Sequence, residues 1–122
     1  MIVEFRKARF LKSATCRNEC PNGLPEIVFI GKSNVGKSSL INALCDNKNL
    51  AFTSSKPGHT RLLNFFEIPT QCYLVDAPGY GYSAAGQRHT VIFGDMMEDY
   101  FSNESAIKCV VFLLDSRRDL NE

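Results

Sequence analysis

The chain has 122 residues, of which 44% are hydrophobic and 22% are charged, and its formal net charge at pH 7 is +1. This length suits one domain with a workable core, and the composition is that of a soluble globular protein, which excludes low-complexity and collagen-like chains. A net charge so close to zero identifies no polyanionic partner. The charged first residues predict no secretory signal peptide, and no run approaches the roughly 20 apolar residues of a membrane span, so we expect a cytoplasmic protein.

The N-terminal segment is more basic than the rest of the chain. Residues 1–20 contain five basic and two acidic side chains: Arg6, Lys7, Arg9, Lys12 and Arg17 against Glu4 and Glu19. A short basic arm of this kind could contact RNA. The alternative, which we favour, is a solvated edge strand whose charges prevent aggregation.

The first quarter of the chain is predicted to hold two strands. Residues 2–12 alternate loosely between apolar and polar side chains, which indicates a strand. A loop is predicted to follow up to residue 25, because the chain contains Pro21, Gly23 and Pro25 there. The apolar run at 27–30 is typical of a buried strand.

A helix is predicted next, between two loops. A polar, glycine-containing loop spans 31–37, and residues 38–44 carry their apolar side chains on one helical face. These side chains are Leu40, Ile41 and Leu44. Residues 47–60 are polar and contain Pro57 and Gly58, so they are predicted to form a loop.

The second half of the chain continues the alternation. Residues 62–68 and 72–75 indicate strands, residues 76–86 are rich in glycine, and residues 88–103 fit a helix. Its apolar stripe comprises Ile92, Met96 and Tyr100, with Phe93, Met97 and Phe101 beside it. The continuous apolar run at 107–114 is the pattern of a parallel strand covered on both faces. This order predicts an α/β fold with a mostly parallel sheet.

The five cysteines are predicted to be free thiols. Cys45, Cys72 and Cys109 lie in apolar patterns and read as small core residues. Cys16 and Cys20 form a C-x₃-C pair, which could belong to a zinc site. Such a site needs a second pair or histidines, and neither His59 nor His89 has a suitable spacing.

Residues 31–38 match the phosphate-loop pattern G-x-x-x-x-G-K-[ST] without exception. Glycines let the backbone N–H groups wrap a phosphate, and the N-terminus of the following helix adds its positive dipole end. Lys37 would reach the β- and γ-phosphates, and the Ser38 hydroxyl would ligate Mg²⁺. The alternative is a glycine loop beside a surface lysine. It fits less well, because this match follows a predicted strand and opens a predicted helix.

Two further segments contain residues that could act on the same phosphates and their Mg²⁺. Asp76 ends a predicted strand and begins Asp-Ala-Pro-Gly, so its carboxylate could hold Mg²⁺ through a water. Thr60, in Lys-Pro-Gly-His-Thr-Arg, could offer its hydroxyl to Mg²⁺ only when a γ-phosphate is present, which would make it a switch. The loops after residues 30 and 75 leave their strands at the carboxyl end, where ligands of such sheets bind.

These segments together resemble the EngB-type (YihA/YsxC) GTP-binding proteins, a group of TRAFAC-class P-loop GTPases. The resemblance rests on residues 25–42, 56–61, 76–82 and 114–117, and it extends from about residue 10 to residue 118. It implies a Ras-like three-layer α/β/α sandwich that binds GTP with Mg²⁺ and hydrolyses it. It also implies a role in assembly of the large ribosomal subunit, through that subunit or its rRNA, and an association with cell division and septation.

The resemblance also assigns roles to single residues. It places Lys37 on the phosphates and Ser38, Thr60 and, through water, Asp76 on Mg²⁺. The nucleotide-binding residues it implies are Gly31, Lys32, Ser33, Asn34, Val35, Gly36, Lys37, Ser38, Ser39, Gly58, His59, Thr60, Arg61, Leu62, Asp76, Ala77, Pro78 and Gly79. Tyr80 stands where many GTPases carry a water-orienting glutamine. In related GTPases without that glutamine an asparagine at the position of Asn34 helps to bind K⁺, so we expect Lys37, Thr60 and Asn34 to serve slow, K⁺-stimulated hydrolysis. The alternative is that Asn34 merely tolerates the tight turn of the loop.

The chain departs from the family after the last predicted strand. The guanine-reading N/T-K-x-D string and the later S-A-x loop are absent from the 122 residues, so we expect a single G domain over 1–122 that is incomplete on its C-terminal side. A domain without them is expected to be slow or inactive alone, and a nucleotide-binding module that does not hydrolyse is the alternative. The run at 107–114 would then be an apolar edge that favours dimerisation or strand exchange. A kinase is less consistent with the sequence, because no arginine-bearing lid segment is evident.

Overall fold

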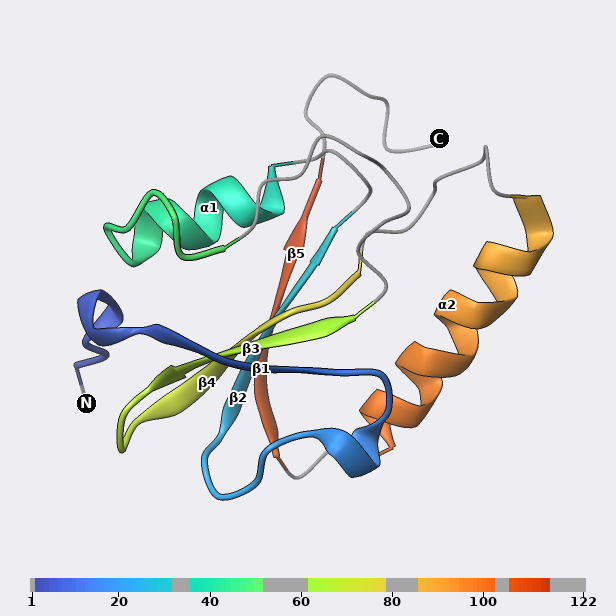
Figure 1. The fold of residues 1–122 in the computed structure, drawn as a ribbon, viewed down its shortest axis with the longest axis horizontal. Helices are drawn as coiled ribbons and strands as arrows, with labels where there is room; N and C mark the ends of the chain where they lie inside the picture. Colours follow the sequence, from blue (N-terminus) through green and yellow to red (C-terminus); the bar gives the residue numbers. More distant parts are fainter. Residues whose placement is uncertain (1, 32–35, 52–61, 79–85, 103–105, 115–122) are drawn as a thin grey trace.

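The structure is a computed structural model, and it describes residues 2–31, 36–51, 62–78, 86–102 and 106–114. Figure 1 shows the elements, which are η1 (Phe5–Lys7), β1 (Arg9–Ala14), η2 (Arg17–Glu19), β2 (Glu26–Gly31), α1 (Lys37–Leu44), β3 (Leu63–Ile68), β4 (Cys72–Asp76), α2 (Gly86–Phe101) and β5 (Ile107–Leu113). Every strand and helix predicted after residue 20 is present, with ends displaced by at most two residues. No helix among the described residues is long and apolar enough to cross a membrane.

The N-terminal strand lies at a different place from the one predicted from the sequence. A strand was predicted over 2–12, but the chain first forms the 3₁₀ turn η1, and β1 begins only at Arg9. Gln71, from the turn between β3 and β4, explains the difference. Its side chain donates to the Ile2 carbonyl (2.6 Å) and accepts from the Glu4 N–H (2.7 Å), so these backbone groups are bound without a strand partner.

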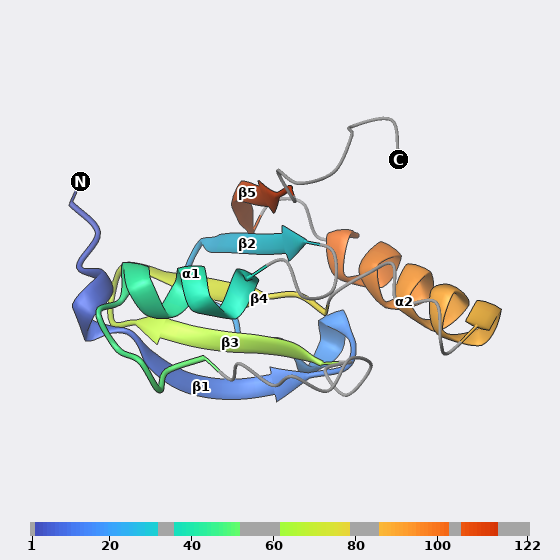
Figure 2. The same cartoon turned by 90° about the horizontal axis from the view of Figure 1, so that it is seen from above.

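The five strands form one mixed sheet in the order β1-β3-β4-β2-β5. Figure 2 shows them side by side in this order. Strand β2 is parallel to both of its neighbours, β4 and β5, as predicted, whereas β3 is antiparallel to both β1 and β4. Only three residues separate β3 from β4, and so short a connection can join only antiparallel strands.

Helices cover the two faces of the sheet, which gives the three-layer α/β/α arrangement. On the α1 face, Ile41 and Cys45 pack with buried sheet residues such as Phe29, Phe66 and Leu74. On the other face, Met97 and Tyr100 of α2 pack with residues such as Val28, Phe65 and Val75. The last turns of α2 make this contact, and Figure 1 shows its first turn lying away from the sheet.

Strand β5 departs from the prediction of a strand covered on both faces. Among the described residues it pairs with β2 alone and lies at the edge of the sheet. Val111 and Leu113 pack on the α1 face, but Val110 and Phe112, which alternate with them, are 47% and 54% exposed. The expectation of an exposed apolar edge is confirmed.

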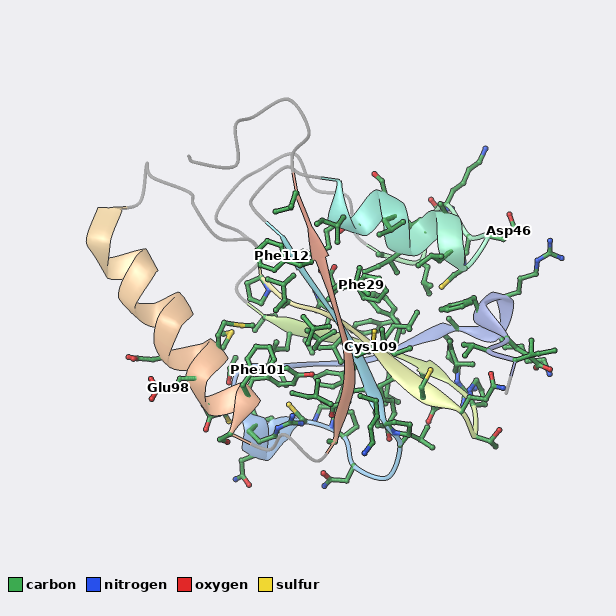
Figure 3. The ribbon with its side chains drawn as sticks, turned by 180° about the vertical axis from the view of Figure 1, so that it is seen from behind. Phe29, Asp46, Glu98, Phe101, Cys109 and Phe112 are labelled. Carbon is green, nitrogen blue, oxygen red and sulfur yellow. The ribbon has the colours of Figure 1, made fainter. Side chains whose placement is uncertain are left out.

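Two smaller predictions about core residues were wrong. Cys109 lies on β5 and is exposed, whereas Cys45 and Cys72 are buried as predicted. Figure 3 shows Cys109 and Phe112 along this edge strand. Leu44, at the last residue of α1, is 40% exposed, although Ile41 on the same helix is fully buried.

Candidate functional site

The first turn of α1 presents a lysine and a serine beside the phosphate-loop sequence. Gly36 immediately precedes the helix in the left-handed region, with φ of 94°, a conformation that glycine adopts without the steric cost of a Cβ. Lys37 is then the first helical residue and Ser38 the second. Gly36 has no side chain that could cap the helix, so it leaves the first N–H groups of α1 without a side-chain partner from this position.

Asp76 meets this turn from the end of β4. Lys37 Nζ forms an ion pair with Asp76 Oδ1, and the Ser38 hydroxyl donates to Oδ2 over 3.4 Å. Both members of the ion pair are largely buried, with side chains only 10% and 3% exposed. The structure thus brings together three of the residues that the sequence assigned to phosphate and Mg²⁺.

The position of Asp76 follows from its strand. It is the last residue of β4 and pairs with Phe29 of β2 on one side and Asn64 of β3 on the other. The next N–H, that of Ala77, donates to the Phe29 carbonyl (3.1 Å) and holds the exit of the strand against β2. Strand β2 leads to α1 and runs parallel to β4. The loops that follow β2 and β4 therefore leave the sheet at the same end, the carboxyl ends of the two strands, as predicted.

The arrangement combines a cation, a hydroxyl and a carboxylate at a helix N-terminus. Hydroxyl and carboxylate oxygens are the ligands that Mg²⁺ prefers, so the donor set of Ser38 and Asp76 fits this ion. The Lys37 ammonium suits a phosphate oxygen, but here it is neutralised by Asp76.

The remaining predicted site residues differ in their burial. Gly31 ends β2 and is buried, as are Ala77 and Pro78, whereas Ser39 and Leu62 are exposed. The other assigned residues lie outside the described part of the chain. They are Lys32, Ser33, Asn34, Val35, Gly58, His59, Thr60, Arg61, Gly79 and Tyr80.

Asn42 is a buried residue near the site that the sequence analysis did not identify. It lies one turn after Ser38, is 8% exposed, and binds the backbone of Lys48 and Ala51. A signal was present in the sequence, because an asparagine interrupts the apolar face formed by Leu40, Ile41 and Leu44. A buried amide in such a face needs hydrogen-bond partners.

Comparison with known proteins identifies the family. Residues 26–122 match the family described as "50S ribosome-binding GTPase". The chain belongs to this family. It therefore shares the P-loop GTPase fold that its phosphate-loop sequence and sheet indicate.

The EngB-type proteins that the sequence resembles are among its relatives. The chain is 47% identical over 115 residues to "Probable GTP-binding protein EngB" of Lactobacillus helveticus (strain DPC 4571), covering 93% of this chain and 59% of that protein. It is 50% identical over 111 residues to the protein of the same name from Chlorobaculum tepidum, covering 90% and 58%. The chain thus spans about three fifths of the length of these relatives.

A solved structure supports the same assignment. The crystal structure of a probable GTP-binding protein engB superimposes with a TM-score of 0.61 and 29% sequence identity. The superposition covers 75% of this chain and 50% of the chain in the crystal structure. The predicted resemblance and the Ras-like fold are therefore both confirmed.

Proposed function

We propose that this chain is the phosphate-binding part of a Mg²⁺-dependent GTPase of the cytoplasm, formed as a single G domain over residues 1–122. One observation carries the proposal: Lys37 and Ser38 at the start of α1 meet Asp76 at the end of β4. Asp76 lies 39 residues after Lys37 and 38 residues after Ser38 in the sequence. They meet at the carboxyl ends of the parallel strands β2 and β4, where such sheets bind ligands. The name GTP-binding protein carried by the relatives supports guanine as the base.

Each of the three residues has a separate role in this proposal. Lys37 binds the β- and γ-phosphates, Ser38 ligates Mg²⁺ directly, and Asp76 orients the hydration of the ion. Mg²⁺ held by Ser38 and Asp76 would neutralise charge that develops during phosphoryl transfer. The residues assigned outside the described segments, Thr60 and Gly79 among them, would complete the contacts to the γ-phosphate.

The proposed macromolecular partner is the large ribosomal subunit or its rRNA, with a role in its assembly and thereby in cell division and septation. The family description and the resemblance support it. Co-sedimentation of the chain with purified 50S subunits, compared in GDP and in a GTP analogue, tests this part. Equal pelleting in both nucleotides would contradict a nucleotide-dependent switch.

A titration with fluorescent GDP and ATP analogues in the presence and absence of Mg²⁺ tests nucleotide binding. Wild-type protein should bind both analogues in the presence of Mg²⁺, because the guanine-reading string is absent from the 122 residues, and Lys37→Ala should abolish binding. Lys48→Ala is the matched control, because Lys48 is an exposed lysine of the same region, beyond the end of α1. If wild type and Lys37→Ala bind equally, or if neither binds, the proposal fails.

Hydrolysis is measured separately from binding. Release of phosphate from GTP should be slow and faster in KCl than in NaCl, because Asn34 is proposed to help bind K⁺. Equal rates in the two salts would remove the K⁺ role. Binding with no turnover in either salt would indicate the alternative function, a nucleotide-binding switch that does not hydrolyse.

A further inference from the structure

A row of polar side chains crosses the sheet at the end where the proposed site lies. Asn64 of β3 lies directly opposite Asp76 of β4, and on its other side it lies opposite Ser13 of β1. Directly opposite residues of antiparallel strands share one face of the sheet, with Cβ atoms about 4.5–5.5 Å apart. Asn64 is therefore a close neighbour of a residue of the site, and the roles proposed so far leave it without a function.

Asn64 and Asp76 both face the α1 side of the sheet. Side chains alternate between the two faces along a strand, so residues two positions apart share a face. Phe66 and Leu74, which lie two positions from Asn64 and Asp76 on their strands, pack in the core that α1 covers. The carboxylate of Asp76 meets the first turn of α1 on this side. The amide of Asn64 thus lies on the same side of the sheet as the cation and the hydroxyl of the site.

The side chain of Asn64 is held from the edge of the sheet. The Ser13 hydroxyl donates to Asn64 Oδ1 over 2.6 Å, in a partly buried contact. A side-chain amide carries its carbonyl oxygen and its two N–H donors on opposite branches. With Oδ1 turned toward β1, the Nδ2 donors are turned away from β1, and the strand on that other side of β3 is β4, which carries Asp76.

The carboxylate of Asp76 has room for a further hydrogen-bond donor. An ionised carboxylate offers about four lone-pair sites. In the described part of the chain, Lys37 binds one of its oxygens and the Ser38 hydroxyl binds the other, over 3.4 Å. Asp76 is only 2% exposed, and carboxylates that act on a metal ion are themselves oriented by hydrogen bonds. A neutral amide supplies such a bond without adding a second charge.

We propose that Asn64 is a positioning residue for the metal-binding role of this site: held by Ser13, it orients the carboxylate of Asp76 toward Mg²⁺. The inference rests on the proposed function, in which Asp76 acts on that ion. It assigns Asn64 to the ion and not to the nucleotide. Loss of Asn64 should therefore raise the Mg²⁺ concentration that nucleotide binding requires and leave binding at saturating Mg²⁺ unchanged.

The alternative role of Asn64 is to fasten the edge strand. In that case its bond with Ser13 would serve only the pairing of β1 with β3, and the Mg²⁺ requirement would not respond to its loss. Two measurements separate the roles. The Mg²⁺ concentration at half-maximal nucleotide binding changes only if Asn64 positions Asp76, whereas the free energy of unfolding in urea falls in either case.

The experiment titrates Mg²⁺ into the full chain at a fixed concentration of a fluorescent GDP analogue. Asn64→Ala removes the amide, and Asn64→Val removes it with a residue that favours strands. Gln71→Ala is the matched control. Gln71 is also a half-buried amide that makes hydrogen bonds, but it lies in the turn at the opposite end of the β3–β4 pair. Circular dichroism establishes which variants fold as the wild type.

We expect the half-maximal Mg²⁺ concentration to rise about tenfold in the Asn64 variants, as is typical when a partner of a metal ligand is lost, with binding at saturating Mg²⁺ within about twofold of wild type. Gln71→Ala should titrate as the wild type does. An unchanged half-maximal concentration, weaker binding at every Mg²⁺ concentration, a similar rise in Gln71→Ala, or failure of both Asn64 variants to fold would each overturn the role of Asn64. Failure of the wild-type chain to bind the analogue, or binding that does not respond to Mg²⁺, would instead overturn the proposed function, and this inference with it.

Discussion

Arg17 and Glu26 form a largely buried ion pair that joins the turn after β1 to the first residue of β2. Two guanidinium nitrogens of Arg17 lie 2.9 Å and 3.2 Å from the two carboxylate oxygens of Glu26, and the side chains are 12% and 1% exposed. Tyr100, near the end of α2, donates its hydroxyl to the same carboxylate (2.6 Å). The guanidinium also stacks on the Tyr100 ring, 4.3 Å from its centroid, so the pair holds the last turn of α2 on the sheet.

Replacing Arg17 should destabilise the protein strongly. Arg17→Met leaves the Glu26 carboxylate buried without its cation, and breaking a buried pair in this way costs about 3–5 kcal/mol. Urea denaturation measures the loss, and the double variant Arg17→Met with Glu26→Leu should recover most of it. Arg9→Met is the control. Arg9 pairs with Glu67 at 3.0 Å but is 69% exposed, so its loss should cost less than about 1 kcal/mol. Similar costs for the two single variants would contradict the burial argument.

Stability should fall as the pH rises from 9 to 11. Burial raises the pKa of the Cys20 thiol from 9.0 to about 11. The folded protein therefore favours the protonated thiol, so this contribution is fully present below pH 9 and is lost as pH rises toward 11. The free energy of unfolding, measured in urea at intervals across this range, should decrease with a slope of at most about 1.4 kcal/mol per pH unit from this group. Cys20→Ala should show a shallower slope, and an identical slope would refute the assignment.

Thiol reactivity should distinguish the five cysteines. Cys109 is exposed on β5 and Cys16 is half-buried, whereas Cys20, Cys45 and Cys72 are buried. An aromatic disulfide reagent at pH 8 should therefore modify Cys109 fastest, Cys16 more slowly, and the other three only on unfolding, since access limits thiol exchange. Cys109→Ser should remove the fastest phase. Retention of that phase in the variant would show that another cysteine is accessible.

The apolar edge at β5 should cause self-association. Val110 is 47% exposed on a strand whose one partner in the described part of the chain is β2, and unpaired apolar edges favour pairing with another chain. Sedimentation velocity should show concentration-dependent dimers or larger species, and Val110→Lys should shift the distribution toward the monomer. Leu44→Lys is the control, because Leu44 is similarly exposed, at 40%, but lies on a helix. A monomeric wild-type chain at every concentration would contradict this prediction.

The meeting of Lys37, Ser38 and Asp76 was more predictable than the packing of the hydrophobic core around them. Lys37, Ser38 and Asp76 were assigned because a short motif and a strand end carry enough information to place them. Their direct ion pair was not foreseen, because the sequence assigned Lys37 to phosphate and Asp76 to Mg²⁺. In the structure the two opposite charges pair with each other.

The order of strands and helices and the proximity of Lys37 and Ser38 to Asp76 could be predicted from the amino-acid sequence alone. Those features depend on hydrophobic periodicity, glycine and short spacings, which act between near neighbours in the chain. Three others became known only from the folded chain: Tyr100 meets Glu26, Cys109 is exposed, and the N-terminal strand begins at Arg9. Each of these depends on which distant segment lies alongside. Tyr100 and Glu26 are 74 residues apart, and Gln71 binds Ile2 across 69. Local pattern cannot specify such partners, because they are selected by packing and by the need to satisfy buried polar groups across the whole chain.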